Sequence, residues 1–334
     1  MAACHECGDT ASLAQITPPK FSFAVTLCAG CAERTGRGEK YIIDRGRLVV
    51  KAPEVALIAV DMWAVNTVHG PGHSSLWGVY QPNRCIVYRL KDASGESYLA
   101  VLNPVRLTGD GLEPVGALHR LEDRLKCKVK ILLSPDSLHN LTIKSYAKLF
   151  PQALFLYPAG RIDRAIPDLA TSVSNAKAFT QSSPEIKSLA EHGLEIHLWR
   201  GAAEPKGDRK GRPVGTTEGC LFFHHASKVL VEGSHLSWIG GPIKSSSWLI
   251  RFILGLDSSK YKVICFAGTS KLPLWDAALF QQGLDRIVSW DWNFITDLHL
   301  APNELVPRKD LIEQYSKIKL GNTVIGLATE DKTG

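Results

Sequence analysis

The chain has 334 residues, of which 45% are hydrophobic and 22% are charged, and its formal net charge is +6 at pH 7. This composition is that of an ordinary globular protein, and it excludes a disordered or low-complexity chain. No apolar run reaches the roughly 18 residues that a membrane-spanning helix needs, and the N-terminus shows no signal-peptide core. The weak positive charge permits an anionic partner but does not indicate one.

Two CxxC pairs, separated by 20 residues, lie in the first 31 residues: Cys4 with Cys7, and Cys28 with Cys31. Zinc takes four soft ligands in a tetrahedron, and each CxxC turn presents two thiolates. Residues 21–27 alternate like a strand that returns the second pair to the first. A redox dithiol or a disulfide pair is the alternative, and His5 could replace one cysteine. We predict a structural zinc, which stabilises folding and leaves no open position for a substrate.

The remaining cysteines lie in apolar runs without framework spacing, at Cys85, Cys127, Cys220 and Cys265. Thiols used in this way indicate a reducing, intracellular compartment, and we expect the cytoplasm. A short Gly-rich stretch over residues 36–40 is typical of a linker. We therefore expect two domains: a zinc-ribbon-like module over residues 1–40 and a large domain over residues 41–328.

The large domain begins with a strand-rich half that leads into a βαβ unit. Strands are predicted over residues 55–60, 85–90 and 98–102, with hairpin chemistry over residues 92–96. A helix over residues 112–126, with apolar residues at 3–4 spacing, precedes a buried strand over residues 129–133. A helix from Leu141 to Phe150 and a strand over residues 153–157 follow.

The second half is again rich in strands and then turns helical. Strands are predicted over residues 194–199, 220–225 and 228–231, helices over 247–256 and 274–282, and short apolar pieces over 286–288 and 294–295. This order of elements predicts two sheets sandwiched between helices.

Several motifs between residues 55 and 305 resemble an uncharacterised, domain-of-unknown-function branch of the metallo-β-lactamase superfamily. They are Asn83–Leu90 and Leu102–Thr108, like "R-hydrophobic-VRL … SPVxLT"; Leu133–Asn140, like "APNxxHH"; Tyr157–Leu169, like "PGxxxKRPDL"; and Leu221–His224 with Trp290–His299, like later motifs. The resemblance implies an α+β fold, an αββα sandwich with its site at one edge of the sheets.

Hydrolases that this superfamily contains carry the motif H-x-H-x-D-H, which holds one or two metals. Aligned on His139, residues 134–139 read Ser-Pro-Asp-Ser-Leu-His, so only Asp136 and His139 can bind a metal there. The next histidine falls near Thr216, and the bridging aspartate falls near Gly233 or Ser234, with Glu232 one step away. His299 is the closing histidine by the same resemblance.

The resemblance therefore implies a reduced, mononuclear site of Asp136, His139 and His299, with Glu232 as a further ligand. Two imidazoles and a carboxylate with open positions suit Zn²⁺ or Fe²⁺, and a metal-bound water would act as base or nucleophile. The alternative is structural: Asp136 caps the following helix, His139 packs in its first turn, and His299 lies on the surface.

Other histidines and one basic loop offer weaker signals. His69 and His73 flank Gly70-Pro71-Gly72 and could line a pocket, and His235 is a reserve ligand. His224 and His225 are neighbours on a predicted strand, so they point to opposite faces and cannot chelate one metal together. The basic stretch over residues 205–212 could contact a polyanion. No Walker A loop, Gly-x-Gly-x-x-Gly or Gly-x-Ser-x-Gly motif is present.

Three functions are compatible with these patterns. The first is a metal-dependent hydrolase or lyase acting on a small molecule. The second is a catalytically inactive pseudoenzyme that binds a protein partner and is stabilised by a structural zinc. The third, ranked last, is nucleic-acid binding or processing, which the net charge and the basic loop support. A membrane partner is not expected.

Overall fold

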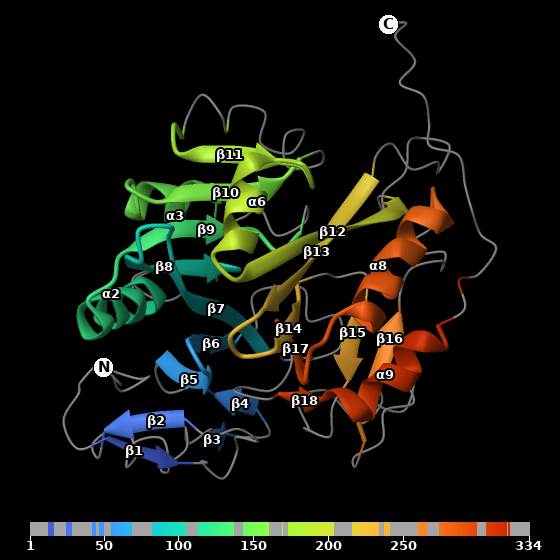
Figure 1. Cartoon of the computed structure of the whole chain (residues 1–334), viewed down its shortest axis with the longest axis horizontal. Coiled ribbons are helices and arrows are strands. Elements are labelled where there is room, and N and C mark those ends of the chain that lie inside the picture. Colours follow the sequence, from blue (N-terminus) through green and yellow to red (C-terminus); the bar gives the residue numbers. More distant parts are fainter. Residues whose placement is uncertain are drawn as a thin grey trace, which may run out of the picture.

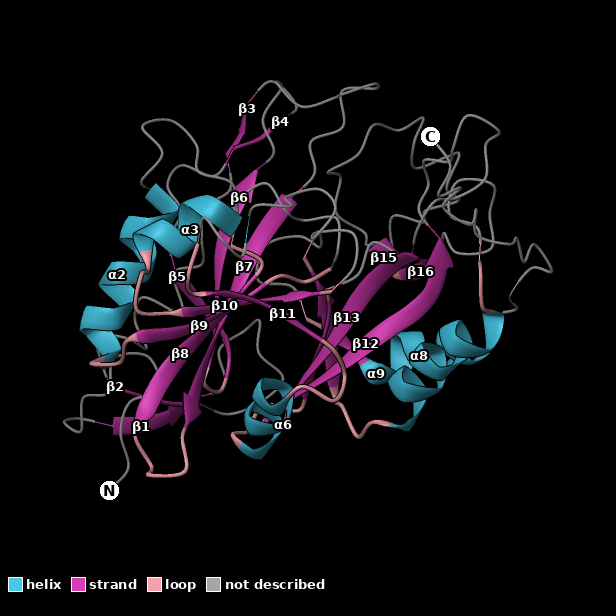
Figure 2. Cartoon of the chain, turned by 90° about the horizontal axis from the view of Figure 1, so that it is seen from above, coloured by secondary structure: helices cyan, strands magenta, loops and turns pink. Residues whose placement is uncertain are grey.

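The chain is described from a computed structural model, which covers residues 13–16, 25–28, 42–44, 47–49, 55–68, 82–104, 113–136, 143–159, 169, 173–203, 216–233, 237–240, 260–265, 274–298, 305–318 and 320. The elements of the large domain form four layers in the order helix, sheet, sheet, helix (Figures 1 and 2). Among the described residues, no helix is both long enough and apolar enough to span a bilayer.

The first sheet has seven strands in the order β11-β10-β9-β8-β7-β6-β5. The first four in the chain form an antiparallel meander: β5 (Val55–Ala59), β6 (Met62–Val68), β7 (Pro82–Lys91) and β8 (Ser97–Leu102). The remaining strands continue in parallel from β8: β9 (Val129–Leu133), β10 (Leu154–Pro158) and β11 (Ala176–Phe179). Helices α2 (Glu113–Leu125) and α3 (Ile143–Leu149) connect β8 to β9 and β9 to β10, and they cover the outer face.

The second sheet has five strands in the order β12-β13-β14-β17-β18. They are β12 (Leu194–Ala203), β13 (Thr216–His224), β14 (Val229–Glu232), β17 (Phe294–Asp297) and β18 (Val306–Pro307). Helices α8 (Ala277–Ser289) and α9 (Arg308–Ser316) cover its outer face, and α6 (Pro184–Glu191) leads from the first sheet into β12 (Figure 2). A separate pair joins β15 (Ser237–Gly240) to β16 (Lys262–Cys265).

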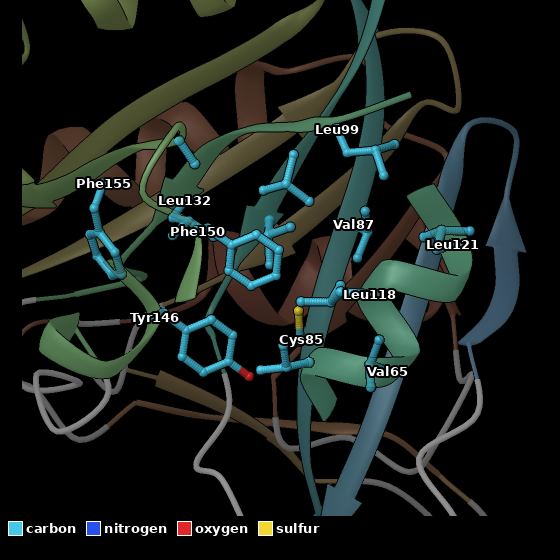
Figure 3. Packing of buried hydrophobic residues seen from close by; sticks show 14 of the residues in the cluster. Val65, Cys85, Val87, Leu99, Leu118, Leu121, Leu132, Tyr146, Phe150 and Phe155 are labelled. Atoms are coloured by element: carbon cyan, nitrogen blue, oxygen red, sulfur yellow. The ribbon is translucent and has the colours of Figure 1, made fainter. Parts of the chain in front are cut away.

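Three apolar clusters fill the spaces between the four layers, and strand alternation decides which residue enters which cluster. On β7, Cys85 and Val87 face α2 and α3, whereas Ile86 and Tyr88 face the second sheet. Figure 3 shows the outer cluster of the first sheet, with Leu118 and Leu121 of α2 lying on strand residues. The middle cluster is covered by a sheet on each side, so its apolar side chains are removed from water.

The αββα sandwich expected from the sequence is confirmed by these layers, and most predicted elements lie within a few residues of observed ones. The sequence analysis did not predict β6, β11, α6, β15, β16, β18 or α9, and the helix that it predicted over residues 274–282 ends earlier than α8 does. Residues 286–288, expected to be a separate apolar piece, form the last turns of α8. The helix predicted over residues 247–256 and the tail lie outside the described residues.

A side chain blocks the free edge of β12. The Gln181 carboxamide donates to the Ile196 carbonyl at 2.9 Å and accepts from the Leu198 N–H at 2.7 Å. Gln181 lies in the connection from β11 to α6, so it joins the edges of both sheets. Edge strands otherwise offer backbone groups to other chains, and this contact satisfies two such groups inside the molecule.

Gly283 permits the close approach of α8 to β12. A Cβ atom added there would lie 2.2 Å from Cδ1 of Trp199, which is fully buried and fixed by a hydrogen bond from its indole N–H to the Phe280 carbonyl. We predict that Gly283→Ala destabilises the fold by about 3 kcal/mol through overpacking. Gly116 lies within α2, where an added Cβ atom would meet only the end of the Arg120 side chain at 3.4 Å. Gly116→Ala should therefore stabilise the fold by up to about 1 kcal/mol. Urea denaturation measures both, and equal effects would contradict the packing argument.

Burial of His224 makes stability depend on pH. Its Nδ1 lies 2.8 Å from the Ser227 hydroxyl, and burial lowers the pKa of its imidazole from 6.5 to about 4. The unfolded chain takes up a proton near pH 6.5, whereas the folded chain does so only near pH 4. Stability should therefore fall by up to about 3 kcal/mol as the pH drops from 6.5 to 4.

His224→Gln should flatten the dependence of the unfolding free energy on pH over this window. The neighbouring His225→Gln is the control, because His225 is exposed and lies in the same turn. Chemical denaturation at several pH values measures the slopes. A His224→Gln slope equal to that of the unchanged chain would contradict this origin of the acid sensitivity.

Candidate functional site at the edge where the two sheets meet

At one edge of the sandwich, backbone contacts join the two sheets directly. The N–H of Arg84, on β7, donates to the carbonyl of Leu298, which follows β17, at 3.1 Å. Asp136, three residues beyond the end of β9, forms an antiparallel bridge with Gly219 on β13. The carboxyl ends of the parallel strands β8, β9 and β10 reach this edge, as do those of the parallel pair β14 and β17. In open α/β sheets such strand ends are where ligands bind.

Buried polar residues gather at this edge, and hydrogen bonds connect them. The Asn103 side-chain amide donates to the Arg84 carbonyl at 2.8 Å, and Arg84 Nη1 donates to the Thr296 hydroxyl at 3.0 Å. Asn103 has a φ of 54°, a left-handed conformation that asparagine tolerates better than most residues. Because a buried polar group is costly unless it is hydrogen-bonded, this network stabilises a polar edge beside an apolar core.

Asp136 is fully buried at this edge. The Ser134 hydroxyl donates to the Asp136 backbone carbonyl at 3.0 Å, which helps to fix the turn after β9. Residues 137–142, between Asp136 and the first described residue of α3, lie outside the described residues, so the alternative role of Asp136 as a helix cap stays a prediction. Within the described residues, Asp136 is the one member of the predicted metal set that lies at the junction.

The two predicted histidine ligands, His139 and His299, lie outside the described residues. The described residues nearest to them in the chain are Leu298, directly before His299, and Asp136, three residues before His139, and both of these lie where the sheets are joined. His69, His73, His235 and the basic stretch 205–212 also lie outside the described residues.

Glu232, named as a further ligand, is not brought to the inner side of this edge. Val229 and Val231 face the first sheet, so Glu232 points with Leu230 to the outer face of the second sheet. There its carboxylate accepts from the Tyr315 hydroxyl of α9 at 2.7 Å. Asp297 lies beside it in register, and its carboxylate accepts from the Ile239 N–H at 2.9 Å.

Gly233, near the expected position of a bridging aspartate, has no room for a side chain. A Cβ atom there would lie 2.7 Å from Cε2 of Phe222 and 3.0 Å from Cβ of Pro135. Because residues next to both sheets fill this space, position 233 cannot accommodate an acidic side chain without a shift of its neighbours. With Glu232 facing outward, the described residues offer no carboxylate at this point of the inner edge.

Sequence reasoning missed Glu218. Cys220 and Phe222 on β13 face the space between the sheets, and alternation puts Glu218 on the same face. Burial raises the pKa of its carboxyl, and the positive charge of Arg200 partly opposes this shift. The sequence could have indicated Glu218, because it lies two residues after Thr216, near which the superfamily's histidine was expected. Residues two apart on a strand lie on the same face.

The metal-binding prediction is only partly covered by the described residues. Within them there is no group of three or more His, Cys, Asp or Glu side chains that could hold a metal ion. The predicted set of Asp136, His139 and His299 is described only at Asp136, so it stays a prediction. That donor set suits one divalent cation, and the packing at Gly233 argues against the superfamily's second one.

The N-terminal module is described only in its strands. β1 (Leu13–Ile16) pairs antiparallel with β2 (Val25–Cys28), and Leu13 lies opposite Cys28. A further pair joins β3 (Ile42–Asp44) to β4 (Arg47–Val49). The predicted strand over residues 21–27 therefore overlaps β2, which ends one residue later. Cys4, Cys7, Cys31 and the side chain of Cys28 lie outside the described structure, so the zinc site stays a prediction.

No protein-family model matches this sequence, and no curated protein matches it. Solved structures with a similar arrangement include a metallo-β-lactamase from Hirschia baltica, at 10% identity and a TM-score of 0.45, covering 80% of this chain and 97% of that one. The metallo-β-lactamase FIM-1 from Pseudomonas aeruginosa, in its mono-zinc form, has 12% identity and a TM-score of 0.44 over 80% of this chain and 95% of that one.

A third similar structure is the metal-soaked Flv1 flavodiiron core from Synechocystis sp. PCC6803. It has 13% identity and a TM-score of 0.45, over 80% of this chain and 60% of that one.

The packing at Gly233 gives a direct test of the closed edge. We predict that Gly233→Ala destabilises the protein by about 2–3 kcal/mol, because its Cβ would overlap Phe222 and Pro135. Gly95→Ala is the matched control, since Gly95 has a φ of 84° but open space around it, and it should cost only about 1 kcal/mol through the backbone. Thermal unfolding compares the two, and a neutral Gly233→Ala would show that the sheets are looser at this edge than described.

Proposed function

We propose that the chain is a metallo-β-lactamase-like hydrolase or lyase that acts on a small molecule through a single metal at the edge where the sheets meet. One observation carries the proposal. The fully buried Asp136 is joined to Gly219 at this edge, and Leu298, the residue before His299, is joined there to Arg84. The support for the proposal is that Asp136, and Leu298 directly before His299, both lie at this edge.

The proposed ligands are Asp136, His139 and His299, a donor set suited to Zn²⁺ or Fe²⁺. When bound, the ion would act as a Lewis acid and make a water molecule more acidic. Hydrogen bonds fix the described residues around the proposed site. The bond from Ser134 to the Asp136 carbonyl fixes the loop after β9, and Arg84 fixes the end of β17 through Thr296 and Leu298.

We also propose that the N-terminal module holds a structural zinc through Cys4, Cys7, Cys28 and Cys31, within a domain of residues 1–40 ahead of the catalytic domain of residues 41–328. Its support is the β1–β2 pairing, which returns Cys28 to a position opposite Leu13, six residues after Cys7. Cys85, Cys127, Cys220 and Cys265 form no disulfide bond in the described part of the chain, which supports a reducing, cytoplasmic location.

A second candidate function is a catalytically inactive interaction protein that keeps only the structural zinc. The observation that favours it is Gly233, where packing leaves no space for an acid, together with the outward direction of Glu232. This candidate and the single-metal enzyme predict different metal contents. Its partner would be another protein, whereas the enzyme's partner would be a small-molecule substrate.

Metal content per chain, measured by mass spectrometry on protein purified without chelators, tests the proposal. We expect two metal ions per chain: one lost in Cys4→Ser/Cys31→Ser, and one lost in Asp136→Asn and in His139→Ala. Each variant should retain the metal ion that the other loses, so each serves as a control for the other. One ion that only the cysteine variant loses would reject the enzyme and favour the interaction protein.

A further inference from the structure

We propose that the outer face of the second sheet carries a binding site for an oxyanion such as phosphate, formed by Arg286, His197 and Trp290. These side chains come from α8, from β12 and from the residue that directly follows α8. The neighbouring Trp199 and Phe223 pack under α8 rather than between the sheets. The site is therefore distinct from the edge where a metal is proposed, and it does not rest on that function.

The three side chains adjoin one another. The Arg286 guanidinium lies over the Trp290 indole, with its central carbon 4.9 Å from the ring centroid. The rings of His197 and Trp290 meet edge to face, with centroids 6.3 Å apart and planes at 88°. Phe223 stacks on the same indole at a centroid distance of 5.6 Å. Packing thus fixes the indole, and both the cation and the imidazole border it.

Two buried N–H donors of this cluster have no acceptor in the described part of the chain. They are Nε of Arg286 and Nε1 of Trp290, and the Trp290 residue is only 6% exposed. A buried donor without an acceptor is costly to the fold. A bound ion or water is one physical explanation of such a group. Because the two donors belong to side chains in contact, one ligand with several acceptor atoms can satisfy both.

The Arg286 side chain is oriented but remains accessible. Its Nη2 donates to the Glu195 carboxylate, whose other oxygen lies 3.4 Å from Nε2 of His225. This pairing orients the guanidinium without using Nε. The side chain is 42% exposed, and exposed side chains change rotamer within nanoseconds. Arg286 can therefore shift to admit a ligand, and its planar fork of donors suits an oxyanion.

The charges around His197 favour an anion. The pKa of its imidazole is lowered to about 4, first by burial and then by the positive charges of Arg286 and Arg200, which outweigh the opposing charge of Glu195. The imidazole is therefore neutral at pH 7 and keeps one N–H donor. Since the neighbouring charges disfavour a cation at this position, they favour an anion there.

The end of α8 does not oppose this assignment. Helix C-termini carry a partial negative charge, which normally repels anions. Here the Arg308 guanidinium donates from Nη2 to the Val288 carbonyl at 2.7 Å and from Nη1 to the Trp290 carbonyl. Because Arg308 offsets the charge of these carbonyls, the helix end does not repel an oxyanion next to Arg286.

The test is a calorimetric titration of the full-length protein with phosphate, at an ionic strength held constant with chloride. The ¹⁵N–¹H resonance of the Trp290 indole, assigned with Trp290→Phe, reports whether phosphate binds at this place. We expect saturable binding that shifts this resonance. Arg286→Gln should weaken the binding by at least about 10-fold, because hydrogen bonds to charged groups are strong ones.

Lys228→Gln is the matched control. Lys228 lies on the same face, over the Phe223 ring and paired with Asp291, so this variant removes an equal charge without removing a donor of the site. It should bind phosphate within about 2-fold of the unchanged chain, because distant surface charges are screened. Arg286→Lys keeps the charge and lacks Nε, and it should fall between the unchanged chain and Arg286→Gln. Circular dichroism and thermal unfolding establish that each variant is folded.

Three results would overturn the proposal. Absence of saturable binding at millimolar phosphate would mean that water is the acceptor for the buried donors. Equal weakening in Arg286→Gln and Lys228→Gln would mean that only the net charge attracts phosphate. Saturable binding that leaves the Trp290 resonance unmoved would place the phosphate elsewhere. Arg286→Gln should keep the metal content of the unchanged chain, so this proposal and the proposed function stand or fall independently.

Discussion

The structure depends on the closure of the two sheets at one edge. Two backbone contacts contribute to that closure: the hydrogen bond from the Arg84 N–H to the Leu298 carbonyl, and the bridge between Asp136 and Gly219. Between the sheets lies an apolar cluster that includes Ile86, Leu133 and Phe222, and its burial supplies the attraction that holds the sheets together. The polar residues at the edge thus border an apolar interior, where charge interactions are stronger than in water.

Strand alternation then decides what each acidic residue can do. Glu232 and Asp297 are neighbours in register, yet both serve the outer layer by accepting hydrogen bonds from Tyr315 and from the Ile239 N–H. Glu218 and Asp136 stand on adjacent segments beside the inner layer, within electrostatic reach of Cys220. A shift of one residue along a strand would exchange the faces on which these acids lie.

Much of the architecture could be predicted from the sequence because the buried strands are continuous apolar runs bounded by turns. β9 and β10 are examples, and the 3–4 spacing of Leu118 and Leu121 identified α2. The extension of α8 could not be predicted, because Gly283 reads as a helix end and its close contact with Trp199 becomes visible only in three dimensions. β11, with an exposed lysine between alanines, carries too weak a pattern.

The candidate site was less accessible to sequence reasoning. Asp136 could be found, because it lies directly after a buried strand within a recognisable motif. Glu232 was selected by nearness to an expected aspartate, but proximity along a strand does not reveal the face. Glu218 was overlooked because the histidine was expected near Thr216, and the position of Glu218 beside the junction follows only from the bridge of Gly219 to Asp136 and from the bulge opposite it.

The most direct test of the central claim is a crystal structure of the full-length protein with anomalous diffraction measured at the absorption edge of its bound metal. The account predicts an anomalous peak at the junction of the sheets, within coordination distance of the Asp136 carboxylate, and separate from any peak among the N-terminal cysteines. A junction without such a peak, in protein that has kept its N-terminal metal, would contradict the claim that this edge is a metal centre.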